Sequence, residues 1–320
     1  MAIEKHCDVI VIGGGAAGLS AALWCVDLGL TTVLIEQNNE FGGQLLNIFN
    51  PISNYPGIDE IGGVELRDRF VSQIRRISID LRSGAAIENI DLAARLIRLE
   101  DGSVLNSNAI ILATGVRRRK LGIPGEDEFA GRGVLDSGVK HRENIRGKRV
   151  VIIGGGDAAI ENAIILGETA ASVTVIHRNE VFRARREFLE VVASMPNLKL
   201  VTEHVVTQIL GTDTVSGVTV MHANTGVVDL PAEAVLIRIG AAPNSEKFCD
   251  QIDLDAAGYI VVDRLCRTSV PGVFAAGDVA EPVSPTIVTA AGMGATAAKA
   301  AFQLIRSNTQ RKSIYLNIFP

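Results

Sequence analysis

The chain has 320 residues, which is long enough for two domains of roughly 100–200 residues, each with its own core. Hydrophobic residues make up 47% and charged residues 21%, and the 32 glycines are scattered, so disordered and collagen-like chains are excluded. A formal net charge of −5 argues against nucleic-acid binding, and no apolar stretch approaches the ~18–20 residues of a membrane span. We therefore expect a cytoplasmic protein with neither nucleic acid nor membrane as a partner.

The first elements along the chain form a βαβ unit. The pattern predicts a buried strand at Cys7–Ile12, a tight turn at Gly13–Gly18, a helix at Leu19–Gly29 and a second strand at Thr31–Glu36. Short apolar runs of this kind are typical of parallel strands that are covered on both faces. The beginning of the chain therefore indicates an α/β domain.

The turn of this unit has the spacing of a dinucleotide-binding motif. Gly13, Gly15 and Gly18 fit G-x-G-x-x-G, in which glycines permit a tight turn, close approach of a pyrophosphate and packing of helix on strand. Glu36 follows about 23 residues after Gly13, at the end of the next strand, where a carboxylate accepts hydrogen bonds from ribose hydroxyls. These residues predict a site for an unphosphorylated nucleotide ribose, as in FAD or NAD.

Two short apolar strands that end in small residues are expected at the same sheet edge. They are Ile110–Gly115 and Val270–Asp278, and their small residues let a flat ligand approach the backbone. Hairpins are predicted from Arg95–Glu100 to Val104–Ser107, and from Val215–His222 to Val227–Leu230.

The same βαβ pattern recurs after residue 149. Its predicted strand is Val150–Ile153, its turn Gly154–Ala159, its helix Ile160–Thr169 and its second strand Ser172–His177. The chain thus has an α/β fold of two Rossmann-like, three-layer nucleotide-binding domains. We expect a discontinuous first domain at residues 1–115 and 245–320, with the second domain inserted as residues 116–244.

A change of charge distinguishes the second turn from the first. The position that corresponds to Glu36 holds His177 and Arg178, with Arg183 nearby, and arginine pairs with a 2′-phosphate that glutamate would repel. This predicts an NADP site, with NAD as the alternative nucleotide. A solvated helix face explains Arg185 and Arg186 better. The residues expected to hold this nucleotide are Gly154, Gly156, Asp157, Ala159, His177, Arg178 and Arg183.

Over nearly its whole length the sequence resembles the low-molecular-weight thioredoxin-reductase-like flavoproteins, of the pyridine nucleotide-disulfide oxidoreductase type. The shared segments are Gly13–Gly18 (GGGAAG), Gly42–Leu45 (GGQL), Asn54–Gly57 (NYPG), Ala113–Gly115 (ATG), Gly154–Ala159 (GGGDAA), His177–Ala184 (HRNEVFRA) and Phe274–Asp278 (FAAGD). The resemblance implies a homodimer, and FAD held by Gly13, Gly15, Gly18, Glu36, Gln44, Asn54, Ala113, Thr114, Gly115, Asp278 and Val279.

The chain departs from this family at the redox-active C-x-x-C. Ser137 and Lys140 occupy the two cysteine positions, and thiol–disulfide exchange requires a thiolate and a partner sulfur. Reduced flavin must therefore pass its electrons directly to an external acceptor. His141 could donate a proton near the flavin while Lys140 stabilises negative charge, or this loop is a solvated charged turn. A second departure is Pro285-Thr286, where the family has an Arg-Gln pair.

The resemblance and one basic segment indicate the class of electron acceptor. The resemblance to sulfur-free ferredoxin–NADP reductases favours ferredoxin or flavodoxin, and the basic run Arg117–Lys120 could dock such an acidic protein. A diflavin enzyme and a non-catalytic nucleotide sensor stay open as alternatives.

No metal site is expected, because Cys7, Cys25, Cys249 and Cys266 form no short-spaced pair and are interpreted as packing residues. The apolar tail Ile314–Pro320 either docks on a partner subunit or covers the flavin.

Overall fold

The computed structural model describes residues 4–58 and 60–318, and the chain divides into two compact units. Unit 1 comprises residues 1–117 and 242–320, and unit 2 comprises residues 118–241. These boundaries fall within a few residues of the expected 115/116 and 244/245. The two connecting segments, β7 (Val116–Arg118) and β16 (Ala241–Pro243), pair as a two-stranded sheet where the chain passes between the units.

Unit 1 is built on a seven-stranded sheet in the order β3-β2-β1-β6-β5-β4, with β17 also paired to β6. The strands are β1 (Glu4–Ile12), β2 (Thr32–Glu36), β3 (Asp80–Ser83), β4 (Ile87–Asp91), β5 (Leu96–Leu99), β6 (Val104–Leu112) and β17 (Val273–Ala275). The first part of β6 pairs antiparallel with β5, which confirms that predicted hairpin, and its last part pairs parallel with β17.

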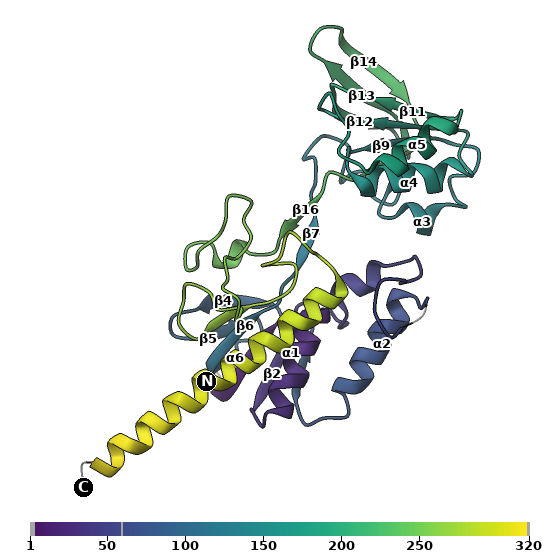
Figure 1. Ribbon diagram of the computed structural model, residues 1–320. Helices are drawn as coiled ribbons and strands as arrows, with labels where there is room; N and C mark the ends of the chain where they lie inside the picture. Colours follow the sequence, from purple (N-terminus) through teal and green to yellow (C-terminus); the bar gives the residue numbers. More distant parts are fainter. Residues whose placement is uncertain (1–3, 59, 319–320) are drawn as a thin grey trace. The chain divides into compact units, whose positions relative to one another are not determined.

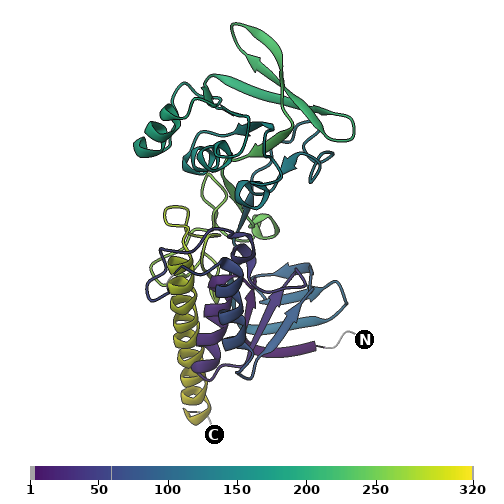
Figure 2. The same cartoon turned by 90° about the vertical axis from the view of Figure 1, so that its right-hand side faces the viewer.

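Helices cover one face of this sheet (Figures 1 and 2). They are α1 (Ala16–Asp27), α2 (Gly63–Ile74) and the long α6 (Ile287–Ile318), and short 3-10 turns lie at η1 (Gly43–Asn47) and η2 (Glu246–Phe248). Alternate residues of β1 serve opposite faces: Val9 and Val11 pack with the helices, while Ile10 and Ile12 pack with the β4–β5 side. A strand that is buried on both faces explains the continuous apolar run.

Unit 2 repeats this plan with a five-stranded parallel sheet in the order β11-β10-β9-β15-β8. Its strands are β8 (Val134–Leu135), β9 (Arg149–Ile153), β10 (Ser172–Ile176), β11 (Leu198–Val201) and β15 (Ala234–Ile237), and its helices are α3 (Gly138–His141), α4 (Asp157–Gly167) and α5 (Arg186–Ser194). An antiparallel sheet of β12 (His204–Gly211), β13 (Val215–His222) and β14 (Gly226–Pro231) supplies the third layer and contains the second predicted hairpin.

Both helices that follow the glycine-rich turns begin earlier than predicted. The expected starts at Leu19 and Ile160 are wrong, because α1 begins at Ala16 and α4 at Asp157. The third small residue of each motif lies inside the first helical turn, where it packs against the strand. A Cβ on Gly18 would lie 1.8 Å from the carbonyl oxygen of Gly13, which explains why this helical position is glycine.

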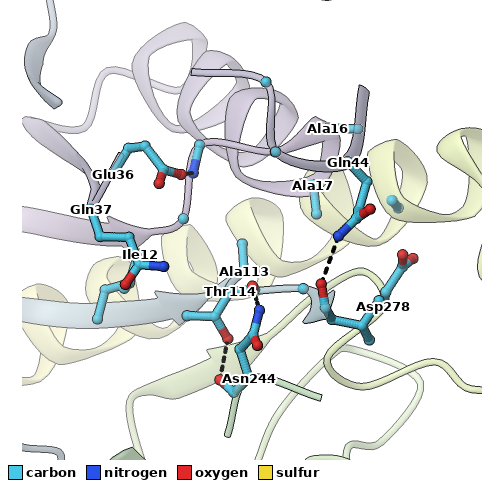
Figure 3. A pocket seen from close by; sticks show the side chains of 18 of the residues that line it. Ile12, Ala16, Ala17, Glu36, Gln37, Gln44, Ala113, Thr114, Asn244 and Asp278 are labelled. Carbon is cyan, nitrogen blue, oxygen red and sulfur yellow. Dashed lines mark hydrogen bonds between the residues drawn. The ribbon is translucent and has the colours of Figure 1, made fainter. Parts of the chain in front are cut away.

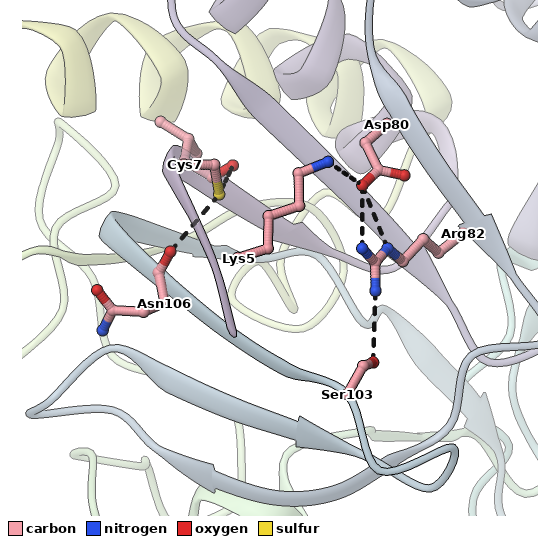
Figure 4. Close-up of polar contacts among 7 residues, drawn as sticks. Lys5, Cys7, Asp80, Arg82, Ser103 and Asn106 are labelled. Atoms are coloured by element: carbon pink, nitrogen blue, oxygen red, sulfur yellow. Dashed lines mark hydrogen bonds and ion pairs between the residues drawn. The ribbon is translucent and has the colours of Figure 1, made fainter. Parts of the chain in front are cut away.

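A polar cluster in unit 1 links the edge strand β3 to β1 and to the turn before β6 (Figure 4). The Lys5 ammonium lies 2.7 Å from the Asp80 carboxylate, and the Arg82 guanidinium contacts the same oxygen at 3.1 Å. Burial disfavours the charged form of Asp80, but the hydrogen bonds from Lys5 and Arg82 outweigh it and hold the pKa of this carboxyl below its usual value. Arg82 also donates to Ser103 in the turn before β6.

The cysteine interpretation needs one correction. Cys7, Cys25 and Cys266 are buried packing residues, but Cys249 is exposed because it follows η2 at the surface of unit 1.

The C-terminal segment is helical, since α6 extends to Ile318. The side chains beyond residue 310, with Phe319 and Pro320, lie outside the described residues, so both interpretations of the tail stay predictions.

Candidate functional site

A cavity of about 470 Å³ lies in unit 1 at the carboxyl ends of β1, β2 and β6 (Figure 3). This is the edge of a parallel sheet at which nucleotides bind. Of the predicted FAD residues, the cavity is lined by Gly13, Gly15, Glu36, Gln44, Ala113, Thr114, Gly115 and Asp278. Residues that are far apart in the sequence therefore meet around one space whose volume suits a ligand of cofactor size.

The glycines of the first turn are required by close backbone contacts. Gly13 has a φ of +105°, and a Cβ there would lie 2.3 Å from the carbonyl oxygen of Ala113. By contrast, the nearest atom to a Cβ on Gly15 would be 3.9 Å away, so this position opens toward the cavity. The first glycine thus brings β1 and β6 together, and the second leaves room for a ligand at the backbone.

The amino end of α1 has features that suit an anionic ligand. Gly15 is its N-cap, no side chain caps it, and its first turn contains no acidic residue. The N–H groups at this end therefore have no side-chain acceptor, and with the helix dipole they have the features of a phosphate site.

The Glu36 carboxylate is held in place beside this turn. Only 6% of Glu36 is exposed; its Oε2 accepts from the Gly14 N–H at 2.8 Å, and its Oε1 accepts from the Asn38 N–H and side-chain amide, both at 2.8 Å. The backbone donors fix the carboxylate at the cavity wall, and its remaining lone pairs can accept ribose hydroxyls.

The far wall is fixed by side-chain bonds to the backbone. Gln44 donates to the Val116 carbonyl at 2.7 Å, and Thr114 and Asn244 exchange two bonds: Thr114 Oγ1 to Asn244 O at 2.7 Å, and Asn244 Nδ2 to Thr114 O at 2.8 Å (Figure 3). Sequence reasoning missed Asn244. The only available signal was its place just after an apolar strand, in the segment that returns to the first domain.

Three predicted FAD residues do not line the cavity. Gly18 packs α1 on the sheet, Val279 is fully buried behind the wall, and Asn54 is exposed in the loop before α2. Asp278 lines the cavity, and burial raises the pKa of its carboxyl. Asp278 has no hydrogen-bond or ion-pair partner elsewhere in the described chain. A half-buried carboxyl without a protein partner fits a wall that contacts a polar ligand.

Taken together, these residues fit FAD. The open glycine turn and uncapped helix suit its pyrophosphate, and the fixed carboxylate suits its adenosine ribose. Small residues at Ala113–Gly115 suit a flat ring system lying against the backbone.

The second glycine-rich turn, in unit 2, repeats these contacts. Gly154 has a φ of +148°, and a Cβ there would lie 2.1 Å from the carbonyl oxygen of Arg238. A Cβ on Gly156 would meet nothing within 4 Å. Gly156 is the N-cap of α4 and, like Gly15, has no side-chain cap. This turn therefore has the features of a second phosphate site.

Contacts divide the four arginines near this turn into two pairs. The Arg185 guanidinium is 2.9 Å from the Asp157 carboxylate, and that of Arg186 is 2.8 Å from Glu190. Arg178 and Arg183 are exposed, and neither side chain has a hydrogen bond or a carboxylate partner among residues 4–58 and 60–318. The Arg183 N–H donates to the Gly155 carbonyl at 2.7 Å, which anchors this arginine at the turn.

His177 lies against the same turn. Its ring would be 2.3 Å from a Cβ on Gly155, and it stacks in a tilted arrangement on Phe182 with 5.2 Å between ring centroids. Burial, with Arg178 and Arg183 nearby, lowers the pKa of His177, so the ring is neutral at physiological pH. Its Nε2 is buried and has no hydrogen-bond partner in the described chain. A neutral His177 acts as packing for the turn rather than as a cation.

Lys140 and His141, the proposed catalytic pair, belong to unit 2. Both contact one carboxylate that sequence reasoning missed: Asp136 lies 2.9 Å from Lys140 Nζ and 2.6 Å from His141 Nε2. Burial opposes ionisation of Asp136, but these two hydrogen bonds outweigh it and hold its pKa below the usual value. Ser137 is 6% exposed and caps α3, where its hydroxyl accepts from the Lys140 N–H. The segment is therefore an ordered turn around Asp136.

The side chains of the basic run Arg117–Lys120 all bond to other residues of the chain. Arg117 pairs with Glu246, Lys120 pairs with Asp127, and Arg118 and Arg119 donate to the carbonyl oxygens of Asp136 and Ala241. These bonds occupy all four side chains and neutralise two of the charges. The run therefore does not present the four free cations that the docking interpretation assumed.

No group of three or more His, Cys, Asp or Glu side chains in the part of the chain that the structure describes is arranged to hold a metal ion. Within residues 4–58 and 60–318, no helix has the length and apolar character needed to cross a membrane.

The chain is similar in sequence and in structure to proteins that are already known. The chain is 36% identical over 296 residues to a thioredoxin reductase of Streptomyces coelicolor, covering 91% of both chains. It is 31% identical to a 34.2 kDa protein in the rubredoxin operon of Clostridium pasteurianum, covering 92% of this chain and 96% of that one. Among solved structures, it resembles Lactococcus lactis thioredoxin reductase in the FR conformation, with a TM-score of 0.83, 32% identity and coverage of 94% and 99%.

The family assignment follows from these matches and from the two glycine-rich turns. The family described as pyridine nucleotide-disulphide oxidoreductase matches residues 7–294, which is most of the chain and includes both turns. This family uses FAD and NAD(P). The chain is thioredoxin-reductase-like in fold and belongs to the pyridine nucleotide-disulphide oxidoreductase family.

Proposed function

We propose that this protein is an NAD(P)H oxidoreductase that holds FAD in unit 1, accepts electrons from a nucleotide in unit 2, and passes them directly to an external acceptor. The observation that carries the proposal is the absence of a dithiol. Its four cysteines lie at positions 7, 25, 249 and 266, and the family's C-x-x-C positions hold Ser137 and Lys140. Neither a hydroxyl nor an ammonium group can exchange with a disulfide.

The cysteines that are present do not replace this dithiol. Burial raises the pKa of Cys7 and of Cys25 to about 12, and that of Cys266 to about 11, so these thiols stay protonated and unreactive. Cys249 is exposed and has no sulfur partner, because the other three cysteines are buried. A route from flavin to thioredoxin through protein sulfur is therefore not part of the proposal.

Cofactor roles follow from the two turns. When bound, FAD accepts a hydride from a reduced nicotinamide and releases electrons to another acceptor. Gly15, Glu36 and Asp278 are the residues that we propose to contact the pyrophosphate, ribose and ribityl regions of FAD. Arg178 and Arg183, which have no carboxylate partner, are proposed to bind the 2′-phosphate of NADPH. NADPH is therefore the preferred nucleotide and NADH the alternative.

For the acceptor we propose a small electron carrier of the ferredoxin or flavodoxin type. The lost dithiol and the similarity to a protein encoded in a rubredoxin operon support this class. Arg117–Lys120 does not, because its side chains are engaged within the chain. Lys140 and His141 are proposed to be held by Asp136 for proton or charge stabilisation during flavin reduction.

A homodimer is also proposed, as the resemblance implies. Unit 1 carries large hydrophobic side chains in water at Val261, Leu265 and Val283, the last of them 90% exposed. Covering such side chains favours association. Light scattering on a size-exclusion column should give twice the 34.0 kDa chain mass, and a mass equal to one chain would contradict the homodimer.

The test of the proposed function is anaerobic reduction of the purified holoprotein, followed by reoxidation. NADPH should bleach the flavin's visible absorption band faster than NADH does, and oxidised ferredoxin or flavodoxin should restore the band. Thioredoxin should not restore it. If neither nucleotide bleaches the band, a sensor is favoured, and two FAD molecules extracted per chain would favour a diflavin enzyme.

A further inference from the structure

The carboxyl edge of the unit 2 sheet carries an excess of positive charge. Arg118 and Arg238 both donate to the carbonyl oxygen of Asp136, the latter at 3.2 Å, and Arg238 also donates to the Ile237 carbonyl at 2.8 Å. In the described chain neither guanidinium is in direct contact with a carboxylate: the Asp136 carboxylate is near enough to act on both charges, but its direct contacts are with Lys140 and His141. Partial burial and the neighbouring Arg118 charge lower the pKa of Arg238 to about 10.

The internal repeat identifies the place of Arg238. In unit 1, a Cβ on the first glycine of the turn would lie 2.3 Å from the carbonyl oxygen of Ala113, and Ala113 lines the cavity. In unit 2, the equivalent distance is 2.1 Å, from Gly154 to the carbonyl oxygen of Arg238. Arg238 therefore has the position in unit 2 that Ala113 has in unit 1, beside the glycine-rich turn that is proposed to bind a dinucleotide.

Strand order identifies which half of the dinucleotide the charges face. In this kind of fold the turn after the first strand, here β9, takes the pyrophosphate, so the adenosine side of a bound nucleotide would extend over β10, where Arg178 lies. The other half must extend over β15 and β8. Arg118 and Arg238 meet at Asp136, which directly follows β8, two strands and about 10 Å from β9. They are thus displaced from the pyrophosphate toward the nicotinamide half.

We propose that Arg118 and Arg238 make unit 2 select the reduced nicotinamide nucleotide over the oxidised one. This inference rests on the proposed function, since it requires NAD(P) at the second turn. The oxidised nicotinamide ring carries a positive charge, whereas the reduced ring is neutral. Arg118, Arg238 and Lys140 share the single carboxylate of Asp136, so the cluster keeps an excess of positive charge, which repels the cationic ring and leaves the neutral ring unaffected. The arrangement therefore favours binding of NADPH and release of NADP⁺.

Binding to the oxidised holoprotein tests this without turnover. The probes are NADP⁺ and 1,4,5,6-tetrahydro-NADP, whose ring is neutral and donates no hydride, and calorimetry gives the Kd of each. We expect the wild type to bind the neutral analogue more tightly. Arg238→Gln and Arg118→Gln should each reduce the ratio of the two Kd values by between about threefold and tenfold, as expected for one unit charge at roughly 10 Å in a partly solvated site.

Two further variants separate charge from other effects. Arg238→Lys keeps the charge and should keep the ratio, and Arg186→Gln removes an arginine of unit 2 that is bound to Glu190 and should not change it. FAD content and melting temperature identify variants that do not fold. Equal weakening of both ligands in Arg238→Gln, or no change, would overturn the proposal. Failure of the wild type to bind either ligand would instead overturn the proposed function, and the selectivity with it.

Discussion

Replacing Arg178 and Arg183 together with glutamine should abolish the proposed preference for NADPH over NADH. Both side chains are exposed beside the second glycine-rich turn, and neither has a carboxylate partner among the residues that the structure describes. Arg183 is held at the turn by its backbone bond to the Gly155 carbonyl, at 2.7 Å. The substitutions therefore remove two positive charges without breaking an ion pair in the protein.

The magnitude follows from the kind of contact and its exposure. A hydrogen bond between charged groups contributes about 1.5–3 kcal/mol when it is shielded, whereas exposed ion pairs contribute about 0.2–1 kcal/mol. Because both arginines are exposed, we assign about 1 kcal/mol to each. The double variant should then lose about 2 kcal/mol of NADPH binding, or roughly 30-fold in Kd. NADH lacks the 2′-phosphate, so its Kd should stay within about twofold.

The assay is the nucleotide concentration dependence of anaerobic flavin bleaching, measured in a stopped-flow instrument with NADPH and with NADH. A matched control is the double variant Arg146→Gln and Arg186→Gln, which removes two exposed arginines of unit 2 that are paired with Glu143 and Glu190. The control should keep the preference for NADPH. Equal losses with NADPH and NADH, or an unchanged preference in Arg178→Gln/Arg183→Gln, would refute the assignment of these arginines to the 2′-phosphate.

Three further predictions concern the backbone, the polar cluster of unit 1 and the thiols. Gly154→Ala should destabilise unit 2, because its Cβ would meet the Arg238 carbonyl at 2.1 Å, whereas Gly156→Ala should keep the melting temperature and weaken nucleotide binding; equal melting temperatures would contradict this. Asp80→Asn should cost about 1 kcal/mol at pH 7 in urea unfolding. The lowered pKa of Asp80 means that its stabilisation is present above about pH 4 and is lost as pH falls through the folded-state pKa, so variant and wild type should converge near pH 2. Ellman's reagent should label one thiol per native chain, Cys249, and rapid labelling of a second would contradict the raised pKa values of the buried cysteines.

The fold was largely predictable because its strands carry a strong local signal. A run such as Val9–Ile12 is buried on both faces, so every residue is apolar, and the glycine-rich turn after it marks the sheet edge. The helix starts were less predictable. The spacing of the glycines does not reveal that the third one packs inside the first helical turn, since that depends on the 1.8 Å approach to the Gly13 carbonyl.

Within the site, sequence identified residues in motifs and missed those that are brought in by topology. Glu36 follows its turn at a recognisable distance, but Asn244 reaches Thr114 only because the chain returns to unit 1 across 130 residues. Arg238 follows an ordinary apolar strand and has no motif of its own. Asp136 could not be identified from the sequence for a similar reason, since its role depends on contacts with Arg118 and Arg238 from distant segments. No local pattern encodes such contacts.

Loss of the dithiol changes what is required of the nucleotide site. A dithiol in the same chain can remove electrons from reduced flavin intramolecularly, but without it the electrons wait for an external acceptor to arrive. Until then, an oxidised nucleotide that stayed bound beside reduced flavin could take the hydride back. Arg118 and Arg238, by disfavouring the cationic ring as proposed, would shorten the time for which the oxidised nucleotide stays bound. The missing dithiol at Ser137–His141 and the two arginines at the proposed nicotinamide side of unit 2 would then serve one requirement: direct transfer from flavin to acceptor, as proposed, benefits from early release of the oxidised nucleotide.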